Sequence, residues 1–248
     1  MKAEVFLTST TVTDEDVRGR TVIIIDVLRA SSTIAAALNN WARAIIPVAD
    51  MGQAGKIASN LDPSSYLLGG ERGGEKIEGY HLGNSPLEYT PSTVGGLTII
   101  FNTTNGTVAI SKARSAEHLV IGSFLNADRV VEYANQAGRD VAIICAGWRN
   151  SIALEDTLCA GLMLHRLWNG REPDRVSDSA HIAFSQYVHD KDNLEAALRK
   201  SNHAQWLIAH GYAEDVDYCL QFDALPVLPY YQDSRLVLYT EHEHEVAA

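Results

Sequence analysis

The sequence has no hydrophobic run long enough to cross a membrane. Its apolar stretches are short, such as Val22–Ile25, whereas a membrane-spanning helix needs about 20 apolar residues in a row. The first residues, Met1–Val5, lack both the basic flank and the apolar core of a secretory signal peptide. Only three cysteines occur, Cys145, Cys159 and Cys219, at spacings that suit neither a disulfide framework nor a metal clip. We therefore expect a cytoplasmic protein with reduced thiols and no contact with membranes.

Basic residues are also scarce. The chain has 20 Lys and Arg against 31 Asp and Glu, which gives a net charge of −11. An acidic surface repels a phosphate backbone, and no basic stripe interleaved with aromatics offsets that repulsion, so we expect no nucleic-acid partner. A small anion can still bind, because only the field inside one cleft matters. Glycine (18) and proline (7) form about a tenth of the 248 residues, which excludes collagen-like and low-complexity chains.

Short apolar runs alternate with segments of helical periodicity, a pattern typical of a parallel sheet covered by helices on both faces. This predicts a three-layer α/β/α fold with a mainly parallel or mixed sheet and a helix-rich C-terminal part. We expect one unit over residues 1–240, which could divide into sub-lobes at about 1–165 and 166–240, and a disordered tail without a role at 241–248. The predicted strands are Glu4–Leu7, Thr21–Leu28, Ala44–Val48, Tyr66–Leu68, Leu97–Phe101, Leu119–Ile121, Val141–Cys145 and, as a returning edge strand, Leu236–Tyr239. The predicted helices are Ala30–Trp41, Asn126–Ala137, Ile152–Trp168, Ala180–Val188, Asn193–Lys200, Ala204–Ala209 and Glu214–Leu220.

Three of the predicted strands run directly into a polar turn of small residues and then into a helix. These segments are residues 23–33, 99–107 and 143–151. In an open α/β sheet the ligand binds at the carboxyl ends of the strands, where helix N-termini offer free N–H groups. If the three strands are neighbours, their loops converge on one site rich in hydroxyls, amides and arginine. Such a site suits an anion.

Asp26 interrupts one of the most apolar strands of the chain. A lone buried carboxylate is costly, so it needs a cation or several hydrogen-bond donors. At a strand end Asp26 can hold a metal ion or pair with Arg29; alternatively, it caps the helix that follows. Ser31, Ser32 and Thr33 open that helix, and an N-cap role accounts for at most one of the three.

A glycine-rich segment, residues 69–79, holds five glycines and five charged residues. Glycines let backbone N–H groups approach an anion, and Arg72 could bind phosphate or sulfonate with two parallel hydrogen bonds. A flexible surface loop explains the composition equally well. The segment is neither a Walker A loop nor a GxGxxG turn.

Glu155 and Asp156 lie near the start of a predicted helix. Acids are common there because they complement the helix dipole. Together with Asp26, however, they could form a site of oxygen ligands for a hard cation. Cys145 and Cys159 are expected to be buried, inert thiols.

The familiar phosphatase nucleophile motifs are absent. A Cys-x5-Arg loop fails because Ser151 and His165 stand where the arginine should be, and an Asp-x-Asp motif fails because Leu28 follows Asp26 at the second position. This favours direct attack by water over a covalent phosphoenzyme. The C-terminal histidines lack HExxH spacing and are expected to be surface or core residues. They are His181, His189, His203 and His210.

Five motifs, taken together and in order, resemble the 2-phosphosulfolactate phosphatase family. The resemblance covers roughly residues 20–165, and the segment Asp215–Gln221 also fits it. The chain departs from the family pattern at His81 and at Trp148-Arg149-Asn150, two places that could alter substrate selection. The motifs are Ile-Asp-Val-Leu-Arg-Ala-Ser-Ser-Thr (25–33), Gly-Glu-Arg-Gly-Gly with Lys-Ile-Glu-Gly and Leu-Gly-Asn-Ser-Pro (70–86), Thr-Thr-Asn-Gly-Thr (103–107), Gly-Ser-Phe-Leu-Asn-Ala (122–127), and Leu-Glu-Asp with Cys-Ala-Gly (154–161).

The resemblance implies a Mg2+-dependent phosphatase that hydrolyses 2-phospho-3-sulfolactate to 3-sulfolactate and phosphate, a step towards coenzyme M. On this hypothesis Mg2+ is held by Asp26 and by Glu155 or Asp156, with Glu71 as a further candidate. The catalytic candidates are Asp26, Arg29, Arg72 and Glu155, and the substrate-binding candidates are Ser31, Ser32, Lys76, Asn84, Thr104, Asn105, Gly106 and Arg149.

Two other functions stay open at this level. The chain could hydrolyse another small phosphorylated hydroxy acid, or it could be an α/β protein that binds small anions without turnover. A homodimer is a fair expectation for a compact enzyme of this size.

Overall fold

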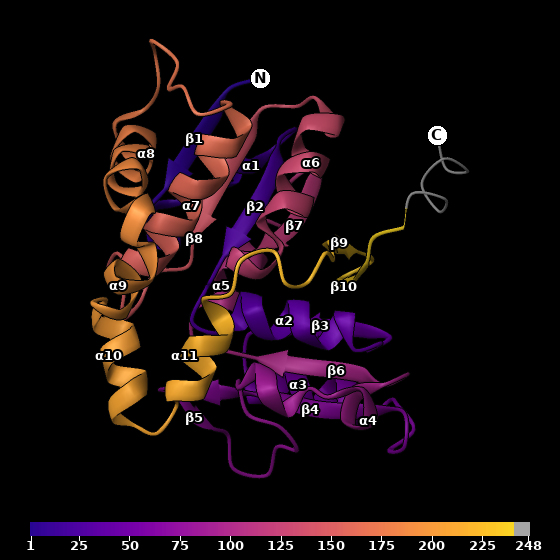
Figure 1. Ribbon diagram of the computed structural model, residues 1–248. Coiled ribbons are helices and arrows are strands. Elements are labelled where there is room, and N and C mark those ends of the chain that lie inside the picture. The colour runs from indigo at the N-terminus through magenta and orange to yellow at the C-terminus, as the bar shows by residue number, and fades with distance from the viewer. Residues whose placement is uncertain (241–248) are drawn as a thin grey trace.

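The apolar runs of the sequence form one mixed sheet in the computed structural model, which describes residues 1–240 (Figure 1). Most predicted strands are present with ends shifted by one to four residues. A hairpin strand near the C-terminus, β9, was not expected. The strands are β1 (Ala3–Phe6), β2 (Thr21–Ile25), β3 (Ala44–Pro47), β4 (Tyr66–Arg72), β5 (Glu75–Lys76), β6 (Thr98–Asn102), β7 (His118–Gly122), β8 (Val141–Cys145), β9 (Pro229–Gln232) and β10 (Arg235–Leu238).

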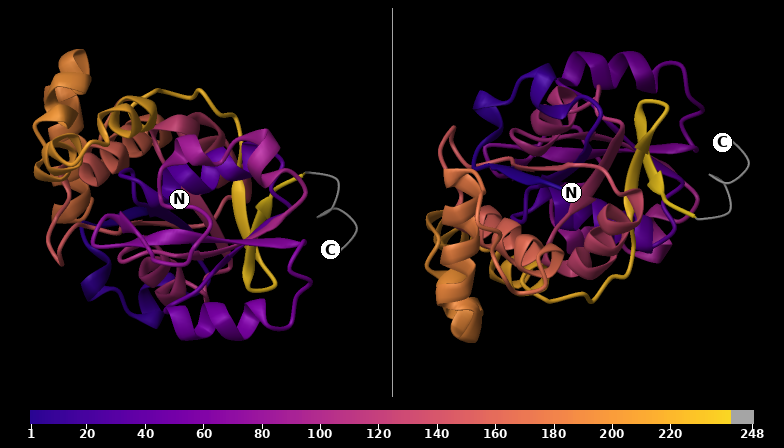
Figure 2. Two further views of the ribbon diagram at one scale, coloured as in Figure 1. Left: turned by 90° about the horizontal axis from the view of Figure 1, so that it is seen from below. Right: turned by 90° about the horizontal axis from the view of Figure 1, so that it is seen from above.

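Helices pack on both faces of this sheet, as the two views of Figure 2 show, so the expected α/β/α architecture is confirmed. The principal helices are α2 (Ala30–Asn39), α3 (Met51–Ala58), α5 (Gly106–Lys112), α6 (Ala127–Ala137), α7 (Leu154–Leu167), α8 (Asp178–Asp190), α9 (Leu194–Arg199), α10 (Asn202–Ala209) and α11 (Ala213–Cys219). Short helices are α1 (Asp14–Val17), α4 (Pro91–Val94), η1 (Ser9–Thr11), η2 (Pro86–Glu88), η3 (Phe124–Asn126) and η4 (Lys191–Asn193).

The sheet consists of two parallel halves joined by an antiparallel hairpin. Its order is β1-β8-β2-β7-β9-β10-β3-β6-β4-β5. The pairs β1–β8, β8–β2 and β2–β7 are parallel, as are β3–β6 and β6–β4, whereas β9–β10 bridges the halves. The prediction of an edge strand at Leu236–Tyr239 is wrong. Leu236 pairs with Tyr231 on one side and with Ile45 on the other, and it is fully buried, so β10 lies inside the sheet.

Alternation along β2 divides the core between the two faces. Ile23 and Ile25 pack with side chains of α6 and α7, while Val22 and Ile24 pack with α2 and α5. The second cluster also includes Ile99 of β6, so α2 and α5 lie against both halves of the sheet. All three cysteines are free and buried, as expected for two of them, and burial raises the pKa of each thiol.

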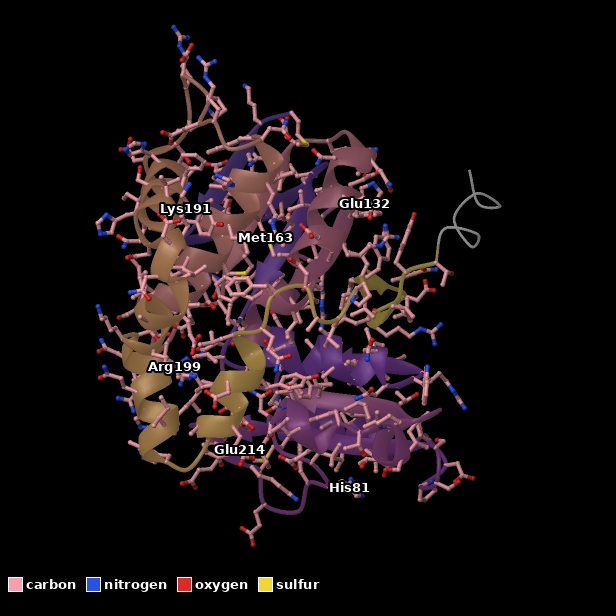
Figure 3. All side chains as sticks on the ribbon, in the orientation of Figure 1. His81, Glu132, Met163, Lys191, Arg199 and Glu214 are labelled. Carbon is pink, nitrogen blue, oxygen red and sulfur yellow. The ribbon has the colours of Figure 1, made fainter. Side chains whose placement is uncertain are left out.

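Side chains of α7 and of the helices that follow it pack against one face of the sheet. Met163, labelled in Figure 3, is fully buried in the cluster between α7 and the strands. Further along the chain, α10 and α11 lie near the C-terminal ends of β2, β6 and β8 (Figure 1). Within residues 1–240 no helix is both long and apolar enough to span a membrane. The tail predicted at 241–248 lies outside the described residues.

Gly70 allows β4 to pass close to β6, and we expect Gly70→Ala to destabilise the protein strongly. Gly70 has a φ of 141°, and a Cβ there would lie 1.9 Å from the carbonyl oxygen of Asn102. Since backbone must move on both strands, the free energy of unfolding should fall by about 3 kcal/mol or more in urea titrations. Gly55→Ala is the control, because its Cβ meets nothing within 4 Å and it lies inside α3. Equal stability of the two variants would contradict the prediction.

Candidate active site

Segments from distant parts of the chain meet at a cavity of about 120 Å³. The loops that follow β2, β6 and β8 reach it from the sheet, the turn after β4 closes one side, and α10 closes another. The expected convergence of the three strand ends is therefore confirmed, although β6 belongs to the other half of the sheet from β2 and β8. The lining residues are Asp26, Leu28, Arg29, Glu71, Gly73, Gly74, Asn84, Thr104, Asn105, Trp148, Arg149, His203 and Trp206.

Asp26 follows the last residue of β2 and is buried at the cavity. Its carboxylate accepts a hydrogen bond from the Ala30 backbone N–H, so the helix-capping and the active-site interpretations both apply. Burial raises the pKa of Asp26 to about 7; His203 opposes this, while Glu71 and Glu155 add to it. A raised pKa means that the ionised form of Asp26 is unfavourable in this environment, and a bound cation would stabilise that form.

Arg29 does not pair with Asp26, contrary to one of the alternatives considered above. Its guanidinium donates to Asp215 Oδ2 at 2.6 Å and to the Gly74 carbonyl at 2.7 Å, and it lies 4.2 Å from the centre of the Tyr212 ring. Asp215 accepts a further hydrogen bond from the Ser85 hydroxyl at 2.6 Å. The buried ion pair joins α11 to the loop after β2, 186 residues away in the sequence.

Glu71 turns the glycine-rich segment into an ordered hairpin rather than a flexible loop. One carboxylate oxygen accepts from the Gly74 N–H at 2.6 Å, and the other accepts from the Thr104 N–H at 2.7 Å. Glu71 thereby ties β4 to the loop after β6 and faces the same cavity as Asp26.

Glu155 and Asp156 lie in the first turn of α7, as predicted, and have different environments. The two oxygens of Asp156 accept from the backbone N–H groups of Val27 (2.9 Å) and Gly147 (3.0 Å), and the residue does not line the cavity. Burial, reinforced by Glu155 and Asp26, raises the pKa of Asp156. Glu155 lies behind His203, with Oε1 2.9 Å from the histidine Nδ1, and its buried Oε2 has no hydrogen-bond partner among the described residues.

Several predicted site residues lie away from the cavity. Arg72 is exposed and lines an adjoining cavity of about 280 Å³, and Lys76 donates to the His81 carbonyl at the surface. Ser31 accepts from the Asp26 N–H and Ser32 donates to the Val27 carbonyl, so both hydroxyls shape the loop after β2. Asn84, Thr104, Asn105 and Arg149 do line the cavity, and Gly106 is close enough that a Cβ on it would lie 2.9 Å from Asp26 Oδ2.

Sequence reasoning missed the residues that α10 contributes. His203 was expected at the surface or in the core, yet it lines the cavity, where its ring stacks on Trp148 at 4.9 Å between centroids. Trp206, one turn further along α10, lines it too. No spacing motif marks these residues. For Asp215, the only sequence signal is the resemblance of its segment to the family.

The donors and acceptors at the cavity suit a hard cation together with a phosphate. Asp26, Glu71 and the side-chain oxygen of Asn84 present oxygens, and Asn84 Oδ1 is buried without a hydrogen-bond partner among residues 1–240. No three His, Cys, Asp or Glu side chains of the described residues lie close enough together to hold a metal ion by themselves. In proteins Mg2+ is commonly bound by one or two carboxylates, water and substrate oxygens.

Comparison with known proteins supports the family resemblance. The family model described as 2-phosphosulpholactate phosphatase matches residues 6–234. The chain is similar to three proteins named probable 2-phosphosulfolactate phosphatase. That of Caldanaerobacter subterraneus is 37% identical over 231 residues, which cover 92% of this chain and 95% of the relative. That of Symbiobacterium thermophilum is 38% identical over 90% of this chain and 96% of the relative, and that of Clostridium beijerinckii is 32% identical over 95% and 99%.

Proposed function

Since the chain belongs to the 2-phosphosulfolactate phosphatase family, we propose that it hydrolyses 2-phospho-3-sulfolactate to 3-sulfolactate and phosphate with the help of Mg2+. The observation that carries the proposal is one cavity in which Asp26 and Glu71 face Arg29 and Arg149. The carboxylates there can hold a cation, Arg29 can hold the phosphoryl group that the cation polarises, and Arg149 can bind another part of the substrate. The relation to coenzyme M, the cytoplasmic location and the homodimer stay predictions.

The cation ligands we assign are Asp26 and Glu71, with the Asn84 oxygen as a neutral donor. Glu155 and Asp156 are less suitable, because the first lies behind His203 and the second does not line the cavity. When bound, Mg2+ would supply Lewis acidity at a phosphoryl oxygen and orient the attacking water.

Three further residues of the cavity, Arg29, Thr104 and Asn105, bind and neutralise the phosphoryl group. Arg29, whose position is set by Asp215, directs its charge at the equatorial oxygens, and Thr104 and Asn105 add donors at the N-terminus of α5. Positive groups aimed at these oxygens stabilise a loose phosphoryl-transfer transition state. Attack by water fits the absence of both familiar nucleophile motifs.

His203 is the group we assign to protonate the leaving ester oxygen. Glu155 accepts at Nδ1, which fixes the ring orientation, while Nε2 has no hydrogen-bond partner in the described part of the chain. Stacking on Trp148 further restricts the ring. An alkoxide leaving group gains from such a proton donor.

The test is phosphate release from a panel of 2-phospho-hydroxyacids, assayed with Mg2+ and with excess EDTA. The panel contains 2-phospho-3-sulfolactate, its analogue with carboxylate in place of sulfonate, and 2-phospholactate. We expect the sulfonated compound to have the highest kcat/KM and EDTA to abolish its turnover, with recovery on adding Mg2+.

Each alternative predicts a different result. Turnover of another panel member alone would support the proposed mechanism and contradict the proposed substrate. Tight binding of the panel without release by any preparation would favour a non-catalytic anion binder. Phosphate trapped on Ser, Asp or Cys by acid quench would reject direct attack by water.

A further inference from the structure

A second cavity adjoins the candidate active site. It measures about 340 Å³ and shares Trp148, Arg149 and His203 with the first cavity, so these three residues form the wall between the two. Its other polar residues come from the turn after β8 and from the junction of α9 and α10. The remaining lining residues are Ser151, Ile152, Ala153, Leu154, Glu155, Lys200, Ser201 and Asn202.

Arg149 is held in place by a tight turn. The backbone N–H groups of Trp148 and Ser151 each donate to the other residue's carbonyl at 2.9 Å. Between them, Arg149 and Asn150 have φ values of 52° and 60°, as the two central residues of a type I′ turn require. The guanidinium lies 4.3 Å from the centre of the Trp148 ring and 6.0 Å from that of Trp206. The side chain is thus positioned by aromatic faces rather than by an acid.

The active-site cavity has two arginines, and Arg149 is the one without a carboxylate partner in the described residues. Arg29 is paired with Asp215, whereas Arg149 has no acidic partner in residues 1–240. Lys200, in the second cavity, likewise has no acidic partner in this part of the chain. The carboxylate at that cavity, Glu155, faces His203. Two cations without acidic partners in the described residues therefore line the second cavity, which lies beside the site assigned to the phosphoryl group.

We infer that Arg149 and Lys200 form a subsite for the acid group on carbon 3 of the substrate, which is the sulfonate of 3-sulfolactate or the second carboxylate of malate, and that Arg149 determines specificity. The inference rests on the proposed function and adds to it the residues that recognise the part of the substrate not transferred. On this assignment the phosphoryl group lies at Arg29 and Asp26, and the other acid group lies at Arg149, on the side of the active-site cavity that borders the second cavity. A guanidinium that is not paired in the protein binds such an anion with charge-assisted hydrogen bonds.

Calorimetric titration of the purified protein with 3-sulfolactate, malate, lactate and inorganic phosphate tests this inference without turnover. We expect 3-sulfolactate to bind at least tenfold more tightly than lactate. Arg149→Asn and Lys200→Ala should each remove most of that advantage and leave the Kd of phosphate within about twofold. Asparagine is chosen because it tolerates a positive φ. Arg171→Asn, an exposed substitution away from both cavities, is the control and should change none of the affinities.

Each outcome decides the inference. Malate binding like 3-sulfolactate would mean that the subsite takes any acid group, and malate binding like lactate would mean that it selects sulfonate; both support it. Equal affinity of the wild type for 3-sulfolactate and lactate would overturn it, as would a parallel loss of phosphate and 3-sulfolactate binding in Arg149→Asn. If the phosphate-release panel fails while 3-sulfolactate binding still depends on Arg149, the proposed reaction is wrong and the acid-group subsite stands.

Discussion

Asp26→Asn should lower kcat by about 10²-fold or more and, in the same preparation, make the metal-free protein more stable at pH 8. The loss of turnover follows from the position of Asp26 at the cavity beside Glu71 and Arg29. Asparagine keeps the size of the side chain and an oxygen that can accept from the Ala30 N–H, so the loop after β2 should keep its shape. Only the negative charge is removed.

The gain in stability follows from the pKa of the buried carboxyl. Burial raises the pKa of Asp26 from 3.8 to about 7 in the folded protein. The folded state therefore retains a proton that the unfolded state has lost, and the stability of the wild type falls as the pH rises from about 4 through 7. The variant lacks this group, so its advantage should grow over the same window and level off above it. We expect the difference between pH 8 and pH 4 to reach about 2–4 kcal/mol.

Urea titrations of both proteins in EDTA, at several pH values, measure this difference. Any cost of the substitution that does not depend on pH cancels when the two pH values are compared. Asp174→Asn, an exposed acid without a hydrogen bond or ion pair in the described residues, should follow the wild type in both stability and activity. If the pH profile of Asp26→Asn matched that of the wild type, the pKa of Asp26 would not be raised in the folded protein, and the prediction would be wrong.

Arg29→Met should reduce the free energy of unfolding by about 3–5 kcal/mol, because it leaves Asp215 buried without its cation. Both side chains are nearly inaccessible, at 3% and 5% exposure. Ser85 still donates to Asp215, but one neutral donor does not replace a guanidinium. The double variant Arg29→Met/Asp215→Leu should recover at least half of the loss, since it removes both charges. Its kcat should stay at least about 10²-fold below that of the wild type, because Arg29 also faces the phosphoryl group.

Urea titrations at low temperature separate the two effects even if the single variant unfolds near 37 °C. Arg199→Met breaks surface ion pairs with Glu195 and Asp217 and is the matched control; its effect should be about 1 kcal/mol or less. Losses that simply add in the double variant would show that Arg29 and Asp215 do not act as a pair. If the double variant recovered both stability and turnover, Arg29 would have no role in the proposed mechanism.

The sequence was sufficient for most of the elements, though not for α3, β5 and β9, and for part of the site. Each strand of the core is a short apolar run, such as Thr21–Ile25, and the polar turns after three of them indicated where a ligand binds. These features are local, since a strand or a helix start depends on residues within a few positions of one another. Asp26, Arg29 and Arg149 could be chosen from the sequence on that basis, and Glu71 as a further candidate after the resemblance to the family; all four line the cavity.

The tertiary structure alone decided which of these groups face one another. The partner of Arg29 is 186 residues away, and His203 reaches the cavity only because α10 packs against the loop after β8. β10 became an inner strand because the hairpin with β9 joins the two halves of the sheet. Local periodicity carries no information about pairs this distant in the chain. The pKa of Asp26 has the same origin: it depends on how much water is excluded and which charges are near, and packing determines both.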